Sequence, residues 1–354
     1  MVDIGKRLQR IKLYQILDKF REGEMSDLLR SEIPDIDFCI EQVIPEMGIV
    51  CIYGPLEQFK STLCLYFALC LATGKDTFIF KTKKRCHVLW IDEEMGVVGL
   101  KNKVSKLCKG LKIDPKELEG YFRYESIKGF KLDDDKSNEH LKSIIMGQDT
   151  DVVFIDSISR VMTGDENKVQ DVNRLHINMR NLCEDCAITF VTIHHTKKSN
   201  GKQIKRIESL RGSSDFGNQV DFAFSLESFE QGKYIFRQEK SRYGLKMPSI
   251  NFSVISDIET LDTFIALTYS GLASENKELA IKSLIYTIKT DILELLRENP
   301  TLDYTQKEIV DEMNLKHHHK KTSVQDATQE LVVDKLIIKT KVKYGAKYSW
   351  PNPE

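Results

Sequence analysis

One stretch, residues 49–62 (IVCIYGPLEQFKST), constrains the fold of this chain more than any other part of its sequence. It begins with consecutive apolar residues, which are typical of a buried strand, and the segment from Lys60 onward has the apolar pattern of a helix. The loop from Gly54 to Ser61 has the spacing G-x-x-x-x-G-K-[ST], except that Phe59 stands where the second glycine is expected. A buried strand, a short loop and a helix in this order predict an α/β unit with the loop at one edge of a sheet.

Loops of this pattern hold phosphate with backbone N–H groups and with the positive end of the helix that follows. We expect Lys60 to reach the outer phosphates of ATP and the Ser61 hydroxyl to ligate Mg²⁺. Phe59 fits such a loop if its φ is negative and its ring points away; otherwise nucleotide binding weakens. The predicted nucleotide-binding residues are Gly54, Pro55, Leu56, Glu57, Gln58, Phe59, Lys60, Ser61 and Thr62.

Length and composition set the outer limits of these predictions. The chain has 354 residues, enough for about two domains. Its net charge of −1 means that any basic surface for nucleic acid must be local. The eight cysteines lie scattered in apolar runs, which indicates reduced, buried thiols. The sequence contains neither a signal-peptide pattern nor an apolar run of the roughly 20 residues that a bilayer requires. We therefore expect a cytoplasmic protein with no membrane contact.

The chain divides into four predicted segments. Residues 1–40 have near-helical apolar spacing and predict an N-terminal helical segment. Residues 41–270 alternate strands and helices, which predicts a mostly parallel sheet with helices on both faces. Residues 271–281 are small and polar and are interpreted as a linker. Residues 282–354 are expected to form a separate small domain.

The small domain has the order of a winged helix, an α+β fold of three helices followed by a hairpin. Its first helix is predicted to end near Asn299, and Thr305 with Glu308 forms a capping box for the second, which is expected to end at Met313. The third helix is predicted over residues 323–334. A turn at residues 344–346 then joins two strands, with glycine supplying the turn.

Polar residues follow three other apolar strands of the large segment. The run HVLWIDEEM delivers Asp92, Glu93 and Glu94, and a carboxylate in this place can activate a water molecule aimed at a phosphate. The run DVVFIDS ends in Asp156, which can hold Mg²⁺. The run ITFVTIHH ends in His195, which can contact the outermost phosphate. Carboxyl ends of parallel strands share one edge of a sheet, so these residues are expected to lie together.

The order of the phosphate loop, Glu94, Asp156 and His195 resembles the RecA-like ATPase core, and most closely the RepA-type hexameric replicative helicases of plasmids and phages. The resemblance covers about residues 41–250. It implies ATP and Mg²⁺ as cofactors and a homo-oligomer, with a hexamer as the expected form. It also implies that Glu94, rather than its neighbour, is the catalytic glutamate, with His195 as a sensor of the γ-phosphate.

The same resemblance implies residues that act on ATP bound by a neighbouring subunit. The tract RGSS, which begins at Arg211, resembles a family motif after the basic loop, and Arg211 is one candidate arginine finger. The tract KSRYG resembles the K-x-R element with which hexameric helicases contact a neighbour's γ-phosphate. Lys240 and Arg242 are the other two candidates. The sequence leaves open which of the three acts.

Two basic regions are candidate contacts with DNA. The first is a loop that matches a channel-facing loop of RecA-like rings and would bind a single strand; a solvated loop is the alternative. Its basic residues are Lys197, Lys198, Lys202, Lys205 and Arg206. The second is the winged helix, which would bind duplex DNA or, alternatively, another protein. Its candidate residues are Lys320, Lys321, Lys341 and Lys343.

Together these expectations describe a ring-forming, DNA-dependent ATPase, of the replicative helicase type, from a plasmid or virus. One alternative is a nucleotide-gated DNA-binding regulator or recombination mediator without helicase activity. Another is an inactive structural subunit, which only Phe59 favours. Retention of Lys60, Ser61, Glu94 and Asp156 favours an active enzyme, because an inactive subunit has no chemical need for all four.

Overall fold

A computed structural model describes the chain from residue 16 to residue 351. It leaves out 17, 21, 32, 34–36, 56–58, 166–167, 196–215, 245, 257–263, 274–276, 318–320 and 343–344 within that range. The chain divides into two compact units, Met1–Gly271 (the large unit) and Leu272–Glu354 (the small unit). Among the described helices, none is both long enough and apolar enough to cross a bilayer.

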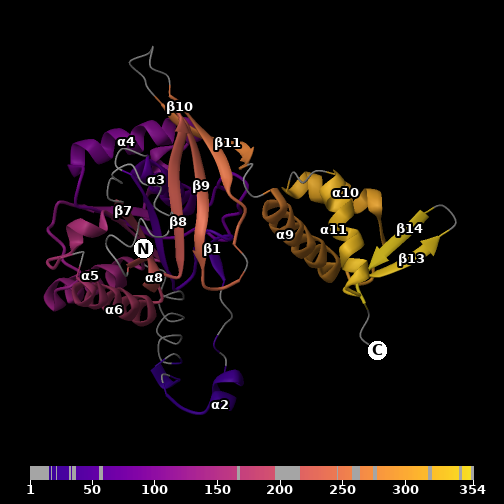
Figure 1. Cartoon of the computed structure of the whole chain (residues 1–354), viewed down its shortest axis with the longest axis horizontal. Helices are drawn as coiled ribbons and strands as arrows, with labels where there is room; N and C mark the ends of the chain where they lie inside the picture. The colour runs from indigo at the N-terminus through magenta and orange to yellow at the C-terminus, as the bar shows by residue number, and fades with distance from the viewer. Residues whose placement is uncertain are drawn as a thin grey trace. The chain divides into compact units, whose positions relative to one another are not determined.

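A nine-stranded sheet forms the centre of the large unit, in the order β11-β10-β9-β8-β3-β7-β6-β4-β5 (Figure 1). The six strands from β8 to β5 are parallel where their pairing is defined. They are β8 (Phe222–Glu230), β3 (Ile49–Gly54), β7 (Thr189–His195), β6 (Val152–Asp156), β4 (Val88–Asp92) and β5 (Phe122–Ser126). Strands β9 (Lys233–Ser241) and β10 (Ile250–Ser256) extend the sheet in antiparallel fashion, and β11 (Ile265–Leu272) ends it.

Helices cover both faces of this sheet. On one face, α5 (Asp135–Gln148) and α6 (Val169–Cys186) pack against Cys51 and the side chains of neighbouring strands that share its face. On the other face, Phe67 of helix α3 (Lys60–Thr73) contacts Phe236 in β9. Side chains along a strand alternate between the two faces of the sheet, and this alternation places Phe236 opposite Cys51. The predicted α/β class with a mostly parallel sheet is confirmed. Helix α4 (Gly96–Leu111) follows β4, and the remaining short elements are α2 (Met25–Leu29), β1 (Phe38–Ile40), β2 (Ile44–Pro45), η1 (Pro115–Leu118), η2 (Ile158–Val161) and α8 (Phe216–Gln219).

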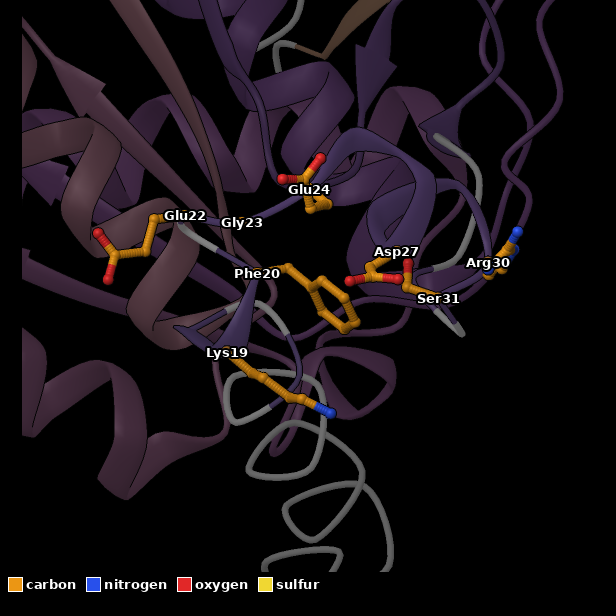
Figure 2. Close-up of a pocket in the computed structure, with 8 residues that line it drawn as sticks. All are labelled: Lys19, Phe20, Glu22, Gly23, Glu24, Asp27, Arg30 and Ser31. Atoms are coloured by element: carbon orange, nitrogen blue, oxygen red, sulfur yellow. The ribbon is translucent and has the colours of Figure 1, made fainter.

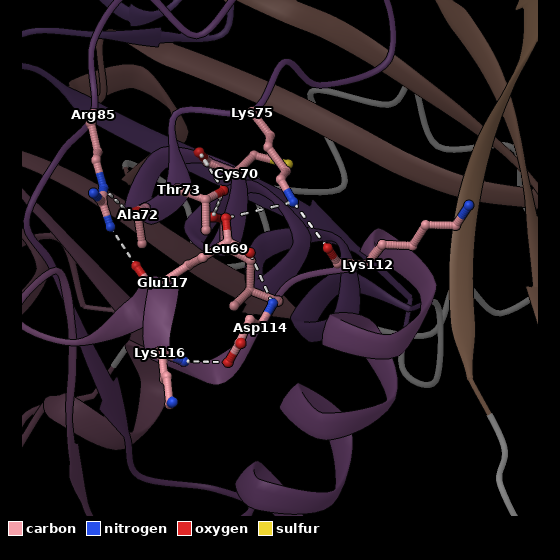
Figure 3. A network of polar contacts seen from close by, with 10 residues as sticks. All are labelled: Leu69, Cys70, Ala72, Thr73, Lys75, Arg85, Lys112, Asp114, Lys116 and Glu117. Carbon is pink, nitrogen blue, oxygen red and sulfur yellow. Dashed lines mark hydrogen bonds and ion pairs between the residues drawn. The ribbon is translucent and has the colours of Figure 1, made fainter.

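A polar network fastens the C-terminal end of α3 (Figure 3). The helix ends at Gly74, whose φ of +76° suits glycine. The Arg85 guanidinium donates to the carbonyl of Ala72 over 2.8 Å, and the Lys75 ammonium donates to the carbonyl of Lys112 over 3.2 Å. Cations at a helix C-terminus donate hydrogen bonds to its last carbonyls and interact favourably with the negative end of its dipole. The helix that begins at Lys60 is therefore held firmly at its far end.

Three strands of the nine-stranded sheet were not predicted from the sequence. Strand β5 lies at an edge of the sheet and is only half buried, so its residues FRYES lack an apolar run. Strands β10 and β11 have mixed burial and carry several hydroxyl side chains. The predicted N-terminal helical segment lies largely outside the described residues; within them, α2 buries no side chain, and β1 ends the segment as a strand.

The small unit has its own core, built by three helices and a three-stranded sheet. The helices are α9 (Lys277–Glu298), α10 (Gln306–His317) and α11 (Lys321–Val333); the sheet has the order β12-β14-β13, formed by β12 (Tyr304–Thr305), β14 (Gly345–Ser349) and β13 (Ile338–Val342). Ile292, Leu296 and Leu331 are among its buried residues. The backbone N–H of Thr305 donates to Glu308 over 2.7 Å, and the N–H of Glu308 donates to the Thr305 hydroxyl over 3.3 Å, which is the expected capping box.

Three predicted boundaries in this region are wrong. The linker predicted over 271–281 is shorter, because β11 continues to Leu272 and α9 begins at Lys277. Residues 277–281, KELAI, are good helix formers and fit the first turn of a helix. Helix α10 continues to His317 instead of ending at Met313. Gly345 is the first residue of β14, so it lies in a strand instead of the predicted turn.

Candidate functional site

The carboxyl ends of β3, β7, β6 and β4 meet at one edge of the sheet and bring the predicted residues together. Gly54 at the end of β3 pairs in register with His195 at the end of β7. Asp156 at the end of β6 pairs in register with Asp92 at the end of β4. Glu94 follows β4 by two residues. This edge of the sheet is therefore the candidate site, as expected from the strand order along the chain.

Lys60 opens α3 and is almost completely buried at this edge, with 3% of its surface exposed. Its ammonium donates a hydrogen bond to the carbonyl of Pro55, at the start of the phosphate loop. Burial lowers the pKa of Lys60 to about 8, and the negative charges of Asp156 and Glu94 oppose that shift. Thr62 is buried in the first turn of α3. The other loop residues, 56–58, lie outside the described part of the chain.

Gly54 is required by the neighbouring strand. A Cβ atom built on it would lie 2.3 Å from the carbonyl oxygen of Leu226 in β8. Since that atom belongs to the backbone of a paired strand, it has little freedom to move aside. The first glycine of the loop pattern thus follows from the close approach of two strands.

Phe59 adopts the backbone conformation of the glycine that it replaces. Its φ of 54° and ψ of 14° place it in the left-handed region, so the negative φ on which an unstrained fit of phenylalanine depended is not present. This conformation costs a residue with a Cβ about 1–2 kcal/mol. The Phe59 ring lies 5.3 Å from the ring of Tyr234 in β9. The loop geometry is therefore kept at an energetic cost that other contacts must offset.

Two aspartates at the same register have opposite surroundings. Asp92 is fully buried and accepts hydrogen bonds from the Ser126 hydroxyl (2.9 Å) and from the backbone N–H of Met95 (2.8 Å). Asp156 is also fully buried, but neither of its carboxylate oxygens has a hydrogen-bond partner of ordinary geometry among the described residues. Burial raises the pKa of Asp156 to about 6, and the nearby Ser61 side chain opposes that shift. A buried carboxylate with so few hydrogen bonds is a suitable ligand for a cation.

The two adjacent glutamates also differ. Glu93 accepts hydrogen bonds of 3.1 Å from the backbone N–H groups of Lys128, Gly129 and Phe130, so it fixes the loop after β5. The Glu94 side chain is 36% exposed, and its Oε2 lies 3.5 Å from Nε2 of His195. This hydrogen bond is the main cause that lowers the pKa of Glu94. Of the three acids after β4, Glu94 alone remains available for chemistry.

The two histidines at the end of β7 have separate environments. His194 is 3% exposed, and burial lowers its pKa to about 4, so its ring is neutral near pH 7. His195 is partly exposed and lies against Glu94. A neutral His194 beside the buried Lys60 avoids a second positive charge in the same place.

A family model described as an AAA domain matches residues 18–201. The chain belongs to the AAA domain family. Among solved structures, the crystal structure of the RadB recombinase is 15% identical to this chain; the match covers 59% of this chain and 88% of that one, with a TM-score of 0.43. No curated protein matches the chain.

The matched region of the AAA domain includes the phosphate loop, Glu94, Asp156 and His195. It also includes a residue that the sequence did not single out. Lys103 in α4 is partly buried, which lowers its pKa, while the charges of Asp156 and Glu94 oppose that shift. A lysine in the middle of an amphipathic helix carries no signal that separates it from the other lysines of α4.

Lys240 and Arg242 follow the region matched to the AAA domain and lie at the opposite edge of the nine-stranded sheet. Asp221 precedes β8, which is parallel to β3, and Arg242 follows the antiparallel β9, so both lie where the parallel strands begin. Arg242 Nη1 is 2.9 Å from Asp221 Oδ1. The Lys240 ammonium donates to the carbonyl of Gly217 over 3.4 Å. The structure thus separates these two residues from the phosphate loop of their own chain.

Asp221 is fully buried at the centre of this second edge. Its Oδ2 accepts a hydrogen bond of 2.7 Å from Arg180 in α6 and another of 2.8 Å from the backbone N–H of Ile49 in β3. One carboxylate therefore joins α6, the start of β3 and the residue after β9. His176, one turn before Arg180, has its pKa lowered to about 4 by burial and by the charge of Arg180.

Most candidate DNA contacts lie outside the described residues. These are Lys197, Lys198, Lys202, Lys205, Arg206, Lys320 and Lys343; the candidate arginine finger Arg211 also lies outside the described residues. Lys321 at the start of α11 and Lys341 in β13 are both described, and both are exposed. All five residues of β13 are exposed, so this strand presents both faces to solvent in the small unit considered alone.

A cavity of about 360 Å³ lies in the N-terminal segment of the large unit (Figure 2). Charged and polar side chains from both ends of the segment line it, together with one aromatic ring. The lining residues are Lys19, Phe20, Glu22, Gly23, Glu24, Asp27, Arg30 and Ser31. None of the predicted site residues lines this cavity, so it is distinct from the edge of the sheet described above.

Proposed function

We propose that this AAA domain binds ATP with Mg²⁺ and hydrolyses it, and that the chain works as a ring-forming, DNA-dependent ATPase of the replicative helicase type. The observation that carries the proposal is the buried Asp156 carboxylate next to Ser61 and Lys60, which has no hydrogen-bond partner of ordinary geometry in the part of the chain that the structure describes. Such a group destabilises the protein unless a cation or a proton neutralises it.

The donors at this edge fit a nucleotide with its metal. The Ser61 hydroxyl and the Asp156 carboxylate are hard oxygen ligands, the kind that Mg²⁺ prefers. Lys60 would hold the outer phosphates once its ammonium leaves the carbonyl of Pro55. The N-terminus of α3, which the side chain of Phe59 does not cap, adds its first backbone N–H groups. When bound, Mg²⁺ would neutralise the charge of the phosphate oxygens.

Glu94 is the candidate general base. Its carboxylate is partly exposed, and its lowered pKa keeps it ionised near pH 7, so it can accept a proton from a water molecule. His195 orients that carboxylate through a contact of 3.5 Å. The same histidine lies in register with Gly54 of the phosphate loop, which favours a role in sensing the nucleotide.

The positions of Lys240 and Arg242 favour the proposal of a ring of several copies of the chain. Because they lie at the edge of the sheet opposite their own phosphate loop, they would reach a nucleotide only in another copy of the chain. An assembly in which each copy presents this edge to the next copy's ATP would be a head-to-tail assembly, which is a ring if its rotation closes and a filament if it does not; we propose a closed hexamer. Arg211 remains a further candidate for the same role.

DNA is the proposed partner of the ring. The loop that carries Lys197, Lys198, Lys202, Lys205 and Arg206 follows β7 and hence leaves the candidate site directly. Positive charge in such a loop suits the backbone of a single strand. In the small unit, Lys321 and Lys341 are proposed contacts with duplex DNA, together with Lys320 and Lys343.

The experiment that tests this proposal measures ATP hydrolysis by the purified protein without nucleic acid, with single-stranded DNA and with duplex DNA. We expect single strands to stimulate hydrolysis. Lys60→Ala should lower turnover at least about 100-fold, because it removes the cation from the outer phosphates. Equal turnover in wild type and Lys60→Ala would show that the measured hydrolysis does not come from this site.

The exposed β13, with Lys339 and Lys341 on it, favours the second candidate, a nucleotide-gated regulator or recombination mediator that binds duplex DNA. Strand displacement separates the two. A helicase unwinds a forked duplex in an ATP-dependent manner, whereas a regulator binds the same duplex without unwinding it. Stimulation of hydrolysis by duplex alone would also favour the regulator.

A further inference from the structure

A row of aromatic rings leads away from the phosphate loop. The Phe59 ring lies 5.3 Å from Tyr234 in β9, at an interplanar angle of 47°. Tyr234 stacks on Phe252 in β10, with ring centroids 5.4 Å apart and an angle of 19°. Phe252 in turn lies 5.2 Å from Phe78. Tyr234 is 6% exposed and Phe252 is fully buried, so the row is largely inside the protein.

The row returns to the helix that begins at the loop. Phe78 lies 5.0 Å from Tyr66 and 6.1 Å, edge to face, from Phe67, and both of these belong to α3. The backbone N–H of Phe78 also donates to the Tyr66 hydroxyl over 3.1 Å. The rings therefore connect the residue before α3 to the second turn of α3 by way of β9 and β10.

We propose that Phe59 is a positioning residue for the phosphate loop and that Tyr234 is its anchor. The inference rests on the proposed function, because its measured consequence is the affinity for nucleotide. Glycine at this position would populate the left-handed region freely. Phenylalanine avoids that region unless its side chain is held, and the contact with Tyr234 holds it. The ring contact thus replaces the missing glycine.

Phe59 would act on nucleotide binding by fixing the backbone of the phosphate loop. The backbone N–H groups of the loop bind phosphate only when they point inward together, and the conformation of residue 59 sets the direction in which the chain enters α3. A loop fixed before the nucleotide arrives loses less entropy on binding. The strength of phosphate binding then depends on the packing of β9, although no atom of Tyr234 needs to touch the nucleotide.

The test is a double-mutant cycle between residues 59 and 234, read as the dissociation constant of a fluorescent ATP analogue in the presence of Mg²⁺. Tyr234→Ala should weaken binding about fivefold, the size that an aromatic pair contributes. KM for ATP should rise by a similar factor, while kcat at saturating MgATP changes less than about twofold. Tyr234→Phe keeps the ring and should restore the affinity. In a Phe59→Gly background, Tyr234→Ala should change the dissociation constant less than about twofold.

Phe38→Ala is the matched control, because it removes a stacked ring pair (Phe38 on Phe222, 5.9 Å) that does not involve the loop. If Tyr234→Ala lowers the melting temperature too far, Tyr234→Leu keeps apolar volume without a ring and takes its place. An unchanged dissociation constant in Tyr234→Ala and Tyr234→Leu, or an equal loss in the Phe59→Gly background, overturns the inference and leaves the proposed function standing. Failure of the wild type to bind MgATP overturns both.

Discussion

At the carboxyl edge of the sheet Asp156 is buried without an ordinary hydrogen-bond partner, whereas at the opposite edge Asp221 is buried between two arginines and a backbone N–H. Both side chains are fully excluded from solvent. Burial of a carboxylate costs free energy in either place. Among the described residues, Asp221 has two arginines and a backbone N–H that offset that cost, whereas Asp156 has only the nearby Ser61 side chain and the charges of Lys60 and Lys103. The difference indicates that the first edge is built for something that the chain itself does not supply.

The same contrast recurs among the acids after β4. Glu93 and Asp92 each accept hydrogen bonds from backbone N–H groups, and they hold the local structure. Glu94 instead accepts from side chains: its main partner is His195, at the longer distance of 3.5 Å, and Ser157 is a weaker one. Acids with several partners are therefore expected to affect stability when they are changed, and acids with few partners are expected to affect function. The four predictions below test this division.

The largest effect is expected at Glu94. Glu94→Gln should lower the ATP turnover number about 10²- to 10⁴-fold, because it removes the general base, while nucleotide binding is retained. Glu93→Gln is the matched control one residue away. It should lower the free energy of unfolding by about 1–2 kcal/mol through lost backbone hydrogen bonds, with a much smaller effect on turnover. Steady-state kinetics and urea unfolding of both variants measure the two effects. A larger loss of turnover in Glu93→Gln than in Glu94→Gln would contradict the division between acids that affect stability and acids that affect function.

The next effect concerns Asp221. Asp221→Ala leaves Arg180, Arg242 and the N–H of Ile49 without their shared acceptor, and it should lower the free energy of unfolding by about 3–5 kcal/mol. Arg242→Ala should cost less than about 1 kcal/mol, because that side chain is 44% exposed. Urea unfolding of the two variants gives the comparison. Equal losses would mean that Asp221 stabilises the protein mainly through Arg242.

Asp156→Asn, in contrast to Asp221→Ala, should raise the free energy of unfolding. The raised pKa of about 6 means that the folded protein binds a proton more tightly than the unfolded chain, so stability falls as the pH rises from about 4 to 6. At pH 7 the buried charge then costs about 3 kcal/mol, and Asn removes that charge. We expect thermal unfolding without nucleotide to show stabilisation, together with loss of Mg²⁺-dependent nucleotide binding. Asp92→Asn, at the same register, should instead lose about 1 kcal/mol; destabilisation of both variants would argue against a cation site at Asp156.

The smallest effect is a pH dependence at His176. Its pKa of about 4 lies below the ordinary value of 6.5, so the unfolded chain binds more protons between those limits, and stability falls as the pH is lowered through them. Arg180, Arg242 and Lys240 disfavour the protonated ring, and Asp221 favours it. His176→Gln should reduce the loss of stability between pH 7 and pH 5 by about 1 kcal/mol, a figure that allows for partial exposure. Urea unfolding at the two pH values measures it, and an unchanged loss would assign the dependence to other groups, of which His194 is one.

Much of this site could be predicted from the sequence, because buried parallel strands leave long apolar runs that end in polar residues. The runs before Gly54, Glu94, Asp156 and His195 all form strands of the sheet, in the predicted places. Strand β5 gave no such run, because an edge strand is exposed on one side. The order of the motifs along the chain was therefore enough to predict the fold class, whereas the order in which the strands pair is known only from the structure.

Other features depend on contacts between distant parts of the chain, and local sequence carries no record of them. The conformation of Phe59 is stabilised by Tyr234, which lies on a strand far along the chain. The different environments of Glu93 and Glu94 depend on the loop after β5. Asp221 was not singled out, because an aspartate just before a strand is unremarkable until its partners Arg180 and Arg242 are known.

The two glycine positions of the phosphate-loop pattern differ in how much change they tolerate. Residue 54 faces the carbonyl of Leu226, so every substitution there collides with a backbone atom of the neighbouring strand. Residue 59 has room for a large ring, and its restriction is one of conformation alone. Random mutagenesis should accordingly recover functional chains with glycine or an aromatic residue at position 59 and glycine alone at position 54. Evolution could therefore exchange the second glycine of this loop for another residue, whereas the first was fixed once β3 and β8 became neighbours.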